Sequence, residues 1–362
     1  MGEESGPGGR AFEMKLVITG GAGFIGSNFV RYILANHPDY SVLNLDKLTY
    51  SGNLHTLQDV MAEPRHTFIR GDICDRRKVQ EVLSSGVEAV VHFAAESHVD
   101  RSILNSLAFT KTNILGTQCL MDAARQAGVK RFVLVSTDEV YGSAPPGERF
   151  IERSPLAPNS PYAASKAGAD LLARSYFHTY RFPVIITRCT NNYGPYQYPE
   201  KFIPLMITRA MQGGSIPVYG DGLQVRDWIY VMDHCAALDA VLHKGSEGEV
   251  YNLGAGTEWA NIEMARRILQ LLGRPESLLT YVQDRPGHDR RYALDTTKAQ
   301  QELGWAPHTM IEAGLKQTVD WYLSHGDWVE RVAARGYRAY YRRQYDQRDS
   351  TLQEILEPEG EK

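Results

Sequence analysis

Cysteine is scarce in this sequence, and its spacing suggests neither a metal site nor a disulfide framework. The 362 residues include only Cys74, Cys119, Cys189 and Cys235. They form no Cys-x-x-Cys pair and no Cys/His ligand spacing, whereas zinc sites and small secreted disulfide scaffolds depend on such clusters. We therefore expect reduced cysteines that serve as packing residues, and no bound metal.

Long apolar runs and an excess of positive charge are also lacking. The runs Leu16–Thr19 and Ala89–Ala95 are far too short to cross a bilayer. Residues 1–12 are glycine-rich and acidic at Glu3 and Glu4, so they lack the basic start and the apolar stretch of a secretion signal. Lys and Arg total 39 against 43 Asp and Glu, which leaves no basic excess for nucleic acid. We expect a cytoplasmic protein without a nucleic-acid or membrane partner.

What the sequence does contain is a regular alternation of short β-branched runs and helix-length amphipathic stretches. The expected strands are Lys15–Gly20, Ser41–Asp46, His66–Asp72, Ala89–Ala95, Arg131–Thr137 and Pro183–Arg188. The expected helices lie near Gly23–Asn36, Arg76–Ser84, Asn105–Ala127 and Pro161–Tyr180. This pattern predicts an α/β protein with a Rossmann-type, doubly wound parallel sheet.

The rhythm changes after about residue 190, where Pro and Gly punctuate the chain. We predict a Rossmann domain at 14–190, with a later strand near 249–254 returning to it. Residues 191–330 are expected to form mainly a smaller α/β substrate-binding lobe. Residues 1–13 are predicted to be a flexible extension, and 331–362 a charged tail of solvated helix and disorder without an assigned function.

A glycine-rich turn follows the first predicted strand and opens the first predicted helix. Gly20, Gly23 and Gly26 leave side chains absent where the backbone must approach a pyrophosphate and where the helix packs on the sheet. Asp46 lies 20 residues past Gly26, at the end of the next strand, where a carboxylate can accept from both ribose hydroxyls. It would repel a 2′-phosphate, so NAD is favoured over NADP, although Lys47 beside it is a competing feature.

A tyrosine and a lysine one helical turn apart mark a second site. Tyr162 and Lys166 open a predicted helix, and Ser136 and Thr137 end a predicted strand, where ligands of open α/β sheets bind. A nearby ammonium and a positive nicotinamide ring would both lower the pKa of Tyr162, so that it can take a hydroxyl proton. The alternative is that Tyr162 is only a half-buried aromatic residue.

With these residues in place, the chain resembles the extended short-chain dehydrogenases/reductases, and within them the dTDP-glucose 4,6-dehydratases. The matching blocks span roughly residues 15–310 and include GGAGFIGSN, LDKLTYSGN, HFAAESHVDRSI, STDEVYG, PYAASKA, NNYGPYQYPEKFIP and DRPGHDRRYALD. The family's pattern before Asn261 is more polar than the sequence here, so recognition of the base is the part of the resemblance with least support.

The resemblance implies an NAD-dependent dehydration of dTDP-glucose to dTDP-4-keto-6-deoxyglucose. The sugar is oxidised at C4, water is eliminated across C5 and C6, and hydride returns to C6. The resemblance assigns Glu139 as the base at C5 and Asp138 as the acid at the C6 hydroxyl. Two adjacent carboxyls also hold one proton between them more easily than none, which favours a protonated Asp138.

Further contacts follow from the same resemblance. Together with the glycine turn, the expected catalytic and cofactor residues are Gly20, Gly23, Phe24, Ile25, Gly26, Asp46, Lys47, Leu48, Thr49, Asp72, Ile73, Ala94, Ala95, Ser97, Thr112, Thr137, Asp138, Glu139, Tyr162, Lys166 and Asn192. The expected substrate contacts are Ser97, Thr137, Asn191, Lys201, Phe202, Pro217, Tyr219, Arg226, Asn261, Asp284, Arg285 and His288. Arg226 and Arg285 match positions that hold the diphosphate in similar enzymes.

Several alternatives remain open at this point. A 4-epimerase or a UDP-glucuronate decarboxylase shares the glycine turn and the Tyr-Lys pair but lacks the Asp-Glu pair. A dehydratase of a UDP- or CDP-sugar is harder to exclude, and a binding protein without chemistry has no need for all five catalytic residues. The family commonly forms homodimers through a four-helix bundle, which nominates the helices at 105–127 and 161–180.

Overall fold

The computed structural model describes residues 14–333 and 340–356. Its central element is a seven-stranded parallel sheet in the order β10-β6-β5-β4-β1-β2-β3. The strands are β1 (Met14–Thr19), β2 (Tyr40–Asp46), β3 (His66–Arg70), β4 (Ala89–His92), β5 (Arg131–Thr137), β6 (Val184–Cys189) and β10 (Val250–Leu253). The predicted Rossmann-type sheet is confirmed. Because the strand order reverses beside β1, a crevice forms at the carboxyl ends of β1 and β4.

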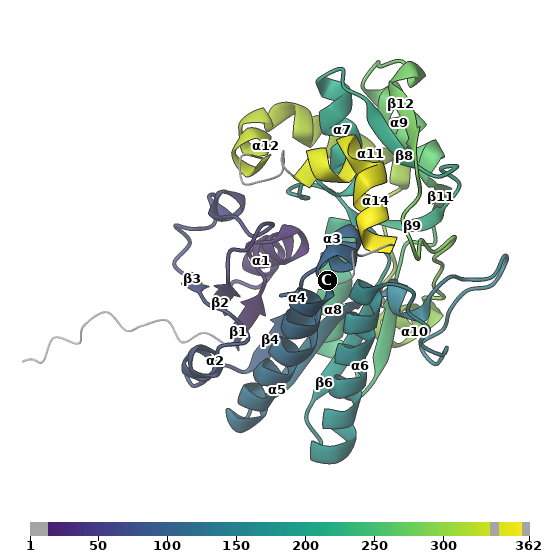
Figure 1. Cartoon of the computed structure of the whole chain (residues 1–362). Coiled ribbons are helices and arrows are strands. Elements are labelled where there is room, and N and C mark those ends of the chain that lie inside the picture. The colour runs from purple at the N-terminus through teal and green to yellow at the C-terminus, as the bar shows by residue number, and fades with distance from the viewer. Residues whose placement is uncertain (1–13, 334–339, 357–362) are drawn as a thin grey trace, which may run out of the picture.

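Helices cover both faces of this sheet (Figure 1). On one face, apolar residues of the sheet pack against α1 (Phe24–Asn36), α8 (Val231–Lys244) and α10 (Thr297–Leu303). On the other face they pack against α2 (Arg76–Leu83), α5 (Thr117–Gln126) and α6 (Pro161–Tyr180). Burial on both faces explains why the strands read as nearly continuous apolar runs.

The stretch 105–127 was predicted as one helix, and the structure divides it. It contains α4 (Ser106–Phe109), the π-helical turn η2 (Thr110–Gly116) and α5, after a separate α3 (Val99–Leu104). The Asn113 side chain explains the wider turn: it accepts from the Glu96 amide at 2.9 Å and donates to the Glu96 carbonyl and the Ser165 hydroxyl at 2.9 and 2.8 Å. Such π turns interrupt α-helices where a functional site needs them.

The second lobe holds two small sheets. One contains β7 (Asn191–Tyr193), β9 (Val225–Tyr230) and β11 (Glu258–Ala260), and the other β8 (Ile216–Tyr219) and β12 (Leu279–Val282). Its core is closed by α7 (Phe202–Met211), α9 (Asn261–Leu271), α11 (Ile311–Ser324) and α12 (Gly326–Ala333). Short helical turns connect these parts: η1 (Leu54–Leu57), η3 (Asp138–Tyr141), η4 (Glu276–Leu278) and η5 (Arg342–Asp346).

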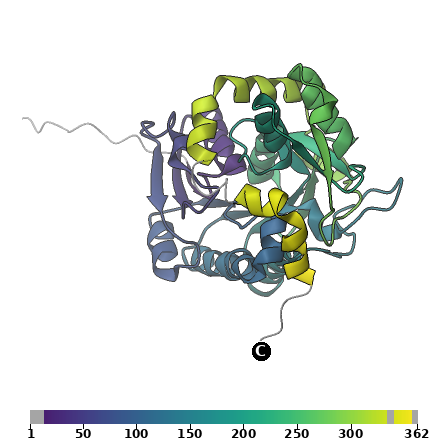
Figure 2. The same cartoon turned by 45° about the horizontal axis from the view of Figure 1, so that its top comes forward.

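The C-terminal segment differs from the solvated helix expected of a charged tail. Residues 340–356, which include η5 and α14 (Arg348–Leu356), cross between the two lobes and are drawn in yellow in Figure 1 and Figure 2. Gln344, Arg348, Thr351 and Leu352 are buried. The predictions for residues 1–13, 334–339 and 357–362 lie outside the described residues. Within the described ranges, no helix has the length and apolar character to span a membrane.

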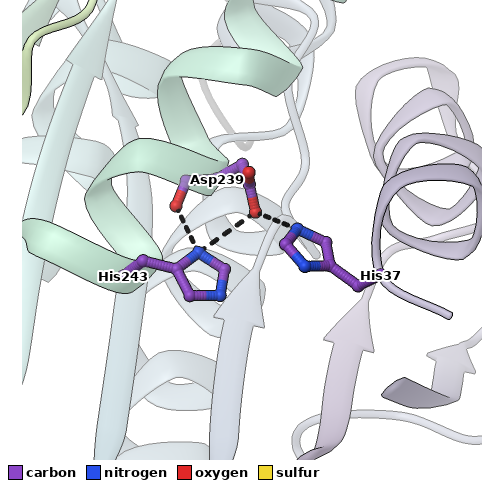
Figure 3. A group of neighbouring side chains, drawn as sticks. All are labelled: His37, Asp239 and His243. Carbon is purple, nitrogen blue, oxygen red and sulfur yellow. Dashed lines mark hydrogen bonds and ion pairs between the residues drawn. The ribbon is translucent and has the colours of Figure 1, made fainter. Parts of the chain in front are cut away.

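A histidine cluster joins the ends of α1 and α8 (Figure 3). The Asp239 carboxylate lies 2.8 Å from His37 Nε2 and 3.2 Å from His243 Nδ1. Among residues 14–333 and 340–356, these three form the one group of His, Cys, Asp or Glu ligand atoms within metal-binding distance of one another. His243 Nδ1 also contacts the Asp239 carbonyl at 2.8 Å, and Nε2 contacts the Tyr40 hydroxyl at 2.7 Å. Hydrogen bonds thus occupy both nitrogens of His243 without an ion.

This cluster predicts a pH-dependent stability. Its histidines hold the pKa of Asp239 below 3.8. The contribution of Asp239 to the free energy of unfolding is therefore present above pH 3.8 and is lost as pH falls through the pKa of Asp239 in the folded protein. Asp239 raises the pKa of His243 above 6.5. The contribution of His243 to the free energy of unfolding is therefore present below pH 6.5 and is lost as pH rises through the pKa of His243 in the folded protein. Asp239→Asn should therefore lower the free energy of unfolding most between pH 3.8 and 6.5.

Urea unfolding of both proteins across this range measures the difference. The control is Asp320→Asn, which breaks an exposed pair with Lys316 whose side chains are 55% and 65% exposed. It should change stability little at any pH, because exposed pairs contribute little. A loss in Asp239→Asn that is constant from acid to neutral pH would contradict the prediction.

Candidate active site

A deep cleft, here called the inner cleft, opens at the carboxyl ends of the sheet strands. It receives the glycine turn after β1, the ends of β2, β4 and β5, and the start of α6. Of the residues predicted to bind the cofactor, all but Leu48 line it: Gly20, Gly23, Phe24, Ile25, Gly26, Asp46, Lys47, Thr49, Asp72, Ile73, Ala94, Ala95, Ser97, Thr112, Tyr162, Lys166 and Asn192. Leu48 instead donates its backbone N–H to Asp46 Oδ1 at 2.7 Å.

The glycine turn is too tightly packed for side chains. Gly20 has φ +72°, and a Cβ there would lie 2.7 Å from the Ala94 backbone nitrogen. A Cβ on Gly26 would overlap the Gly20 carbonyl. The first turn of α1 has no acidic residue, so its free N–H groups face the cleft without a competing carboxylate. This cradle suits a pyrophosphate.

Asp46 is fixed in place at the end of β2. Its carboxylate accepts from the Leu48 N–H at 2.7 Å and from the Ala22 N–H at 2.9 Å, and burial raises its pKa. Lys47 forms an ion pair with Asp72 at 2.7 Å. Because Asp72 already pairs with Lys47, Lys47 is a weaker argument for binding the 2′-phosphate of NADP. The residues therefore fit NAD better than NADP.

The predicted catalytic residues also meet in the inner cleft: Thr137, Asp138, Glu139, Tyr162 and Lys166. Thr137 ends β5 and caps η3, accepting from the Glu139 N–H at 3.3 Å. Its hydroxyl donates to Asp138 Oδ1 at 3.2 Å. Asp138 Oδ2 is buried and has no hydrogen-bond partner among the described residues, so it is free to act on a ligand.

The two adjacent carboxyls differ in their electrostatic surroundings. Burial and the neighbouring Glu139 raise the pKa of Asp138 well above its usual value. Burial also raises the pKa of Glu139, but Arg285, Arg226 and Lys201 oppose that shift. Asp138 is therefore the one that keeps a proton and Glu139 the one that ionises first, a division suited to an acid and a base.

Tyr162 and Lys166 follow the cap Ser160 at the start of α6, as predicted. Without the nicotinamide ring that the prediction invokes, burial, followed by Glu139, raises the pKa of Tyr162 well above its usual value. Lys166 Nζ donates to the Val135 carbonyl at 2.8 Å, and burial lowers the pKa of Lys166.

A second cavity, here called the outer pocket, continues from the inner cleft into the second lobe. Ser97, Glu139, Asn191 and Lys201 line both cavities, so they mark the junction. The predicted substrate contacts that line the outer pocket are Ser97, Asn191, Lys201, Phe202, Pro217, Tyr219, Arg226, Asn261, Arg285 and His288. Thr137 lies in the inner cleft instead.

Asp284 was predicted to contact the substrate, but it lines neither cavity. It lies behind the pocket wall, where it accepts from Gln224 Nε2 and the Arg285 N–H, both at 2.8 Å, and contacts His288 Nδ1 at 2.6 Å. These bonds join its carboxylate to Gln224, Arg285 and His288. Asp284 therefore holds the loop that carries Arg285 and His288, both of which line the outer pocket.

The two pocket arginines are oriented by other contacts. Arg226 donates to the Asp289 carbonyl at 2.9 Å and lies 4.2 Å above the Tyr292 ring. Arg285 pairs loosely with Asp100 at 3.7 Å, and its buried Nε has no hydrogen-bond partner among the described residues. A buried donor of this kind is available to an anionic ligand.

Sequence reasoning missed several residues of the outer pocket. Tyr345 reaches it from the C-terminal segment, and Asp100, Glu200 and Tyr292 are among the other residues that line it. Asp100 was within reach of sequence reasoning, since it lies beside the residues assigned after β4. Tyr345 was not, because nothing local in a charged tail indicates the partner against which it folds.

Comparison with known proteins identifies close relatives. The family described as GDP-mannose 4,6 dehydratase matches residues 17–318. The low-salt glycan biosynthesis protein Agl12 of Haloferax volcanii is 53% identical over 86% of this chain and 99% of its own. The dTDP-glucose 4,6-dehydratase of Streptomyces niveus is 52% identical over 88% of this chain and 95% of its own. The solved structure of the dTDP-glucose 4,6-dehydratase DesIV from Streptomyces venezuelae, with NAD and TYD bound, is 52% identical, with a TM-score of 0.86, covering 88% of this chain and 100% of its own.

Proposed function

This chain belongs to the GDP-mannose 4,6 dehydratase family, and we propose from that premise that it converts dTDP-glucose to dTDP-4-keto-6-deoxyglucose with NAD, in deoxysugar biosynthesis. Relatives named dTDP-glucose 4,6-dehydratase are about half identical to this chain, and the match covers nearly the whole length of each relative. The observation that carries the proposal is the pair Asp138 and Glu139, which lies in the same cleft as Tyr162. A hydride transfer at one carbon requires Tyr162 alone, whereas an elimination also requires an acid and a base.

The residues that would hold NAD are the cradle after β1, the Asp46 carboxylate and the residues at the ends of β3 and β4. When bound, it supplies hydride acceptance at C4 and hydride return at C6, and its positive ring favours the Tyr162 phenolate. Tyr162 takes the proton of the C4 hydroxyl. Lys166 stands one helical turn further on, inside the same cleft.

Elimination falls to the two carboxyls. Glu139 removes the C5 proton, which the C4 ketone has made acidic, and Asp138 protonates the departing C6 hydroxyl. A proton then returns to C5 as hydride returns to C6. The raised pKa of Asp138 keeps its proton available, while three cations near Glu139 favour its ionised form. Thr137 holds the pair in register by bonding to both.

The outer pocket is the proposed binding site of the nucleotide part of the substrate. Arg226 and Arg285 present guanidinium groups to it, and fork-shaped donors suit a diphosphate. His288 and Tyr219 lie edge to face in the same wall, with ring centroids 6.1 Å apart. The pyrimidine base is assigned to this end because the sugar must reach Glu139 at the junction.

Product analysis across dTDP-, UDP-, CDP- and GDP-glucose, without added cofactor, tests the proposal. We expect the dTDP substrate to lose the mass of one water and to give the alkaline absorbance of a 4-ketosugar. An epimerase would release an isomer of unchanged mass, and a binding protein would leave all of the sugars intact. Turnover that is faster with another nucleotide would refute the base assignment but not the reaction.

The protein is further proposed to form a homodimer through α4, η2 and α6, which lie side by side on one face. This face exposes Leu107, Leu115 and Leu171 to 74, 55 and 58%. Apolar side chains clustered on neighbouring helices suit a four-helix contact with a second copy. The cytoplasm is proposed as its compartment, since all four cysteines are free.

Leu171→Glu should convert the dimer to a monomer, because it places a charge in the apolar contact. Light scattering coupled to gel filtration measures the mass. The matched control is Leu323→Glu on α11, where the leucine is 53% exposed but lies away from this face. Leu323→Glu should remain a dimer. A wild-type monomer, or a dimer that survives in Leu171→Glu, would contradict the interface.

A further inference from the structure

An ion pair joins Arg101 to Glu200, which lines the outer pocket beside its junction with the inner cleft. Arg101 of α3 donates to the Glu200 carboxylate through Nη2 at 2.8 Å and through Nε at 3.1 Å. The Glu200 side chain is fully buried, whereas 27% of the Arg101 side chain is exposed. The two residues are 99 positions apart in sequence. Since a buried carboxylate without a partner is costly, Glu200 holds the guanidinium plane in one orientation.

The faces of this guanidinium are covered by two tyrosines. The Tyr50 ring lies 4.1 Å from the guanidinium carbon, and the Tyr340 ring lies 4.2 Å from it. Tyr340 also packs edge to face on His98, with ring centroids 5.3 Å apart. A planar cation between two aromatic faces is a favourable arrangement that an ammonium does not reproduce.

The two tyrosines come from segments that line different cavities: Tyr50 from a loop at the inner cleft and Tyr340 from the C-terminal segment at the outer pocket. Tyr50 lies in the loop 47–53, which lines the inner cleft through Lys47, Thr49, Ser51 and Gly52. Tyr340 begins the segment 340–356, which reaches the outer pocket through Tyr345. In that segment Gln344 donates to the Tyr219 hydroxyl at 2.9 Å, and the Arg348 guanidinium lies 4.4 Å from the Tyr219 ring.

The carboxylate partner belongs to the junction itself. Glu200 precedes Lys201, which lines both cavities and donates to the Ser97 carbonyl at 2.7 Å. Through Glu200, Tyr50 and Tyr340, Arg101 therefore contacts the junction, the cover of the inner cleft and the cover of the outer pocket.

We propose that Arg101 is a positioning residue that fastens the loop over the dinucleotide to the C-terminal segment over the sugar nucleotide. The proposal rests on the function proposed above and adds to it the means by which the cofactor is retained between turnovers. Retention matters because the reaction returns the cofactor to its starting state, so that release serves no step. The C-terminal segment is thereby given a role in cofactor binding, although it does not line the inner cleft.

The test compares Arg101→Met, Arg101→Lys and the double variant Arg101→Met/Glu200→Gln. Two quantities are measured for each: the NAD that remains per protomer after gel filtration, and the kinetics with dTDP-glucose at saturating added NAD. Arg101→Met should retain about tenfold less NAD and raise KM about tenfold, with little change in kcat, since two cation–π contacts are lost. Arg101→Lys should recover only part of both, because it keeps the charge but not the plane.

The double variant distinguishes the loss of the Arg101 contacts with the two tyrosines from the cost of leaving the Glu200 carboxylate buried without a partner. Glu200→Gln removes the unpaired buried charge, so the double variant should regain thermal stability while NAD retention and KM stay impaired. Arg125→Met is the matched control, because Arg125 also lies over a tyrosine ring, 4.7 Å from Tyr180, but away from both cavities. If Arg101→Met does not fold, Tyr340→Leu removes one face of the sandwich without disturbing the ion pair and should shift both quantities in the same direction.

Each outcome decides the proposal. A folded Arg101→Met that keeps wild-type NAD content and KM overturns it, as does full recovery in Arg101→Lys or in the double variant. A wild-type protein that leaves dTDP-glucose unchanged refutes the proposed function instead, and NAD retention still tests the role of Arg101 in that case.

Discussion

Glu139→Gln should lower kcat for ketosugar formation by about 10²- to 10⁴-fold, the usual contribution of a positioned general base. Glutamine preserves the shape of the side chain, so Thr137 still caps the turn and the dissociation constant for dTDP-glucose should change little. Exchange of the C5 hydrogen with solvent deuterium should disappear together with turnover. Product formation and exchange are both followed by mass spectrometry.

The pH profile gives a second readout for the same variant. Burial raises the pKa of Glu139 above 4.5, so activity in the wild type should fall as pH decreases through that raised value. The acidic limb should vanish in Glu139→Gln, because position 139 then carries no group that can be protonated in this range. The control is Glu148→Gln on an exposed turn nearby. Unchanged turnover in Glu139→Gln would remove Glu139 from the mechanism.

Tyr162→Phe should abolish the first oxidation, with a loss of about 10²- to 10⁴-fold. Tyr162 takes the proton of the C4 hydroxyl, and phenylalanine keeps the ring while removing the group that accepts this proton. Neither the ketone nor the later elimination should then form. Rapid-quench analysis of a single turnover, with the sugar products separated, measures this directly.

The matched control is Tyr180→Phe, which alters an exposed tyrosine at the far end of the same helix. It should retain wild-type kinetics. Normal ketosugar formation in Tyr162→Phe would show that another group takes the C4 proton. Because substrate binding depends on the outer pocket, the substrate affinity of Tyr162→Phe should stay close to that of the wild type.

The elements with clear local signals could be predicted from the sequence. The strand Arg131–Thr137 has the predicted ends, and so does the helix Pro161–Tyr180, since Ser160 and Pro161 are a cap and a first-turn residue. The glycine turn and Asp46 were also visible, because they follow a strand at the spacing of a dinucleotide site. Here local pattern and tertiary structure agree.

The remaining features depend on contacts between distant parts of the chain. The π turn within 105–127 depends on Asn113 bonding to Glu96, which helix propensity does not reveal. The same holds for Arg101 and Glu200, and for the C-terminal segment, whose charge predicts solvent rather than the pocket wall. The raised pKa of Tyr162 was missed because it comes from burial and from Glu139, whereas the sequence argument considered only Lys166 and the nicotinamide ring.

The central claim is that hydrogen leaves one carbon of a hexose and returns to another carbon of the same molecule. The most direct test uses dTDP-glucose carrying deuterium at C4, incubated with the purified enzyme and no added cofactor. We expect a 4-keto-6-deoxy product that keeps the deuterium. Magnetic resonance should locate the label at C6, and unlabelled substrate present in the same reaction should not dilute it. A product without the label, or a label scrambled between molecules, would contradict it.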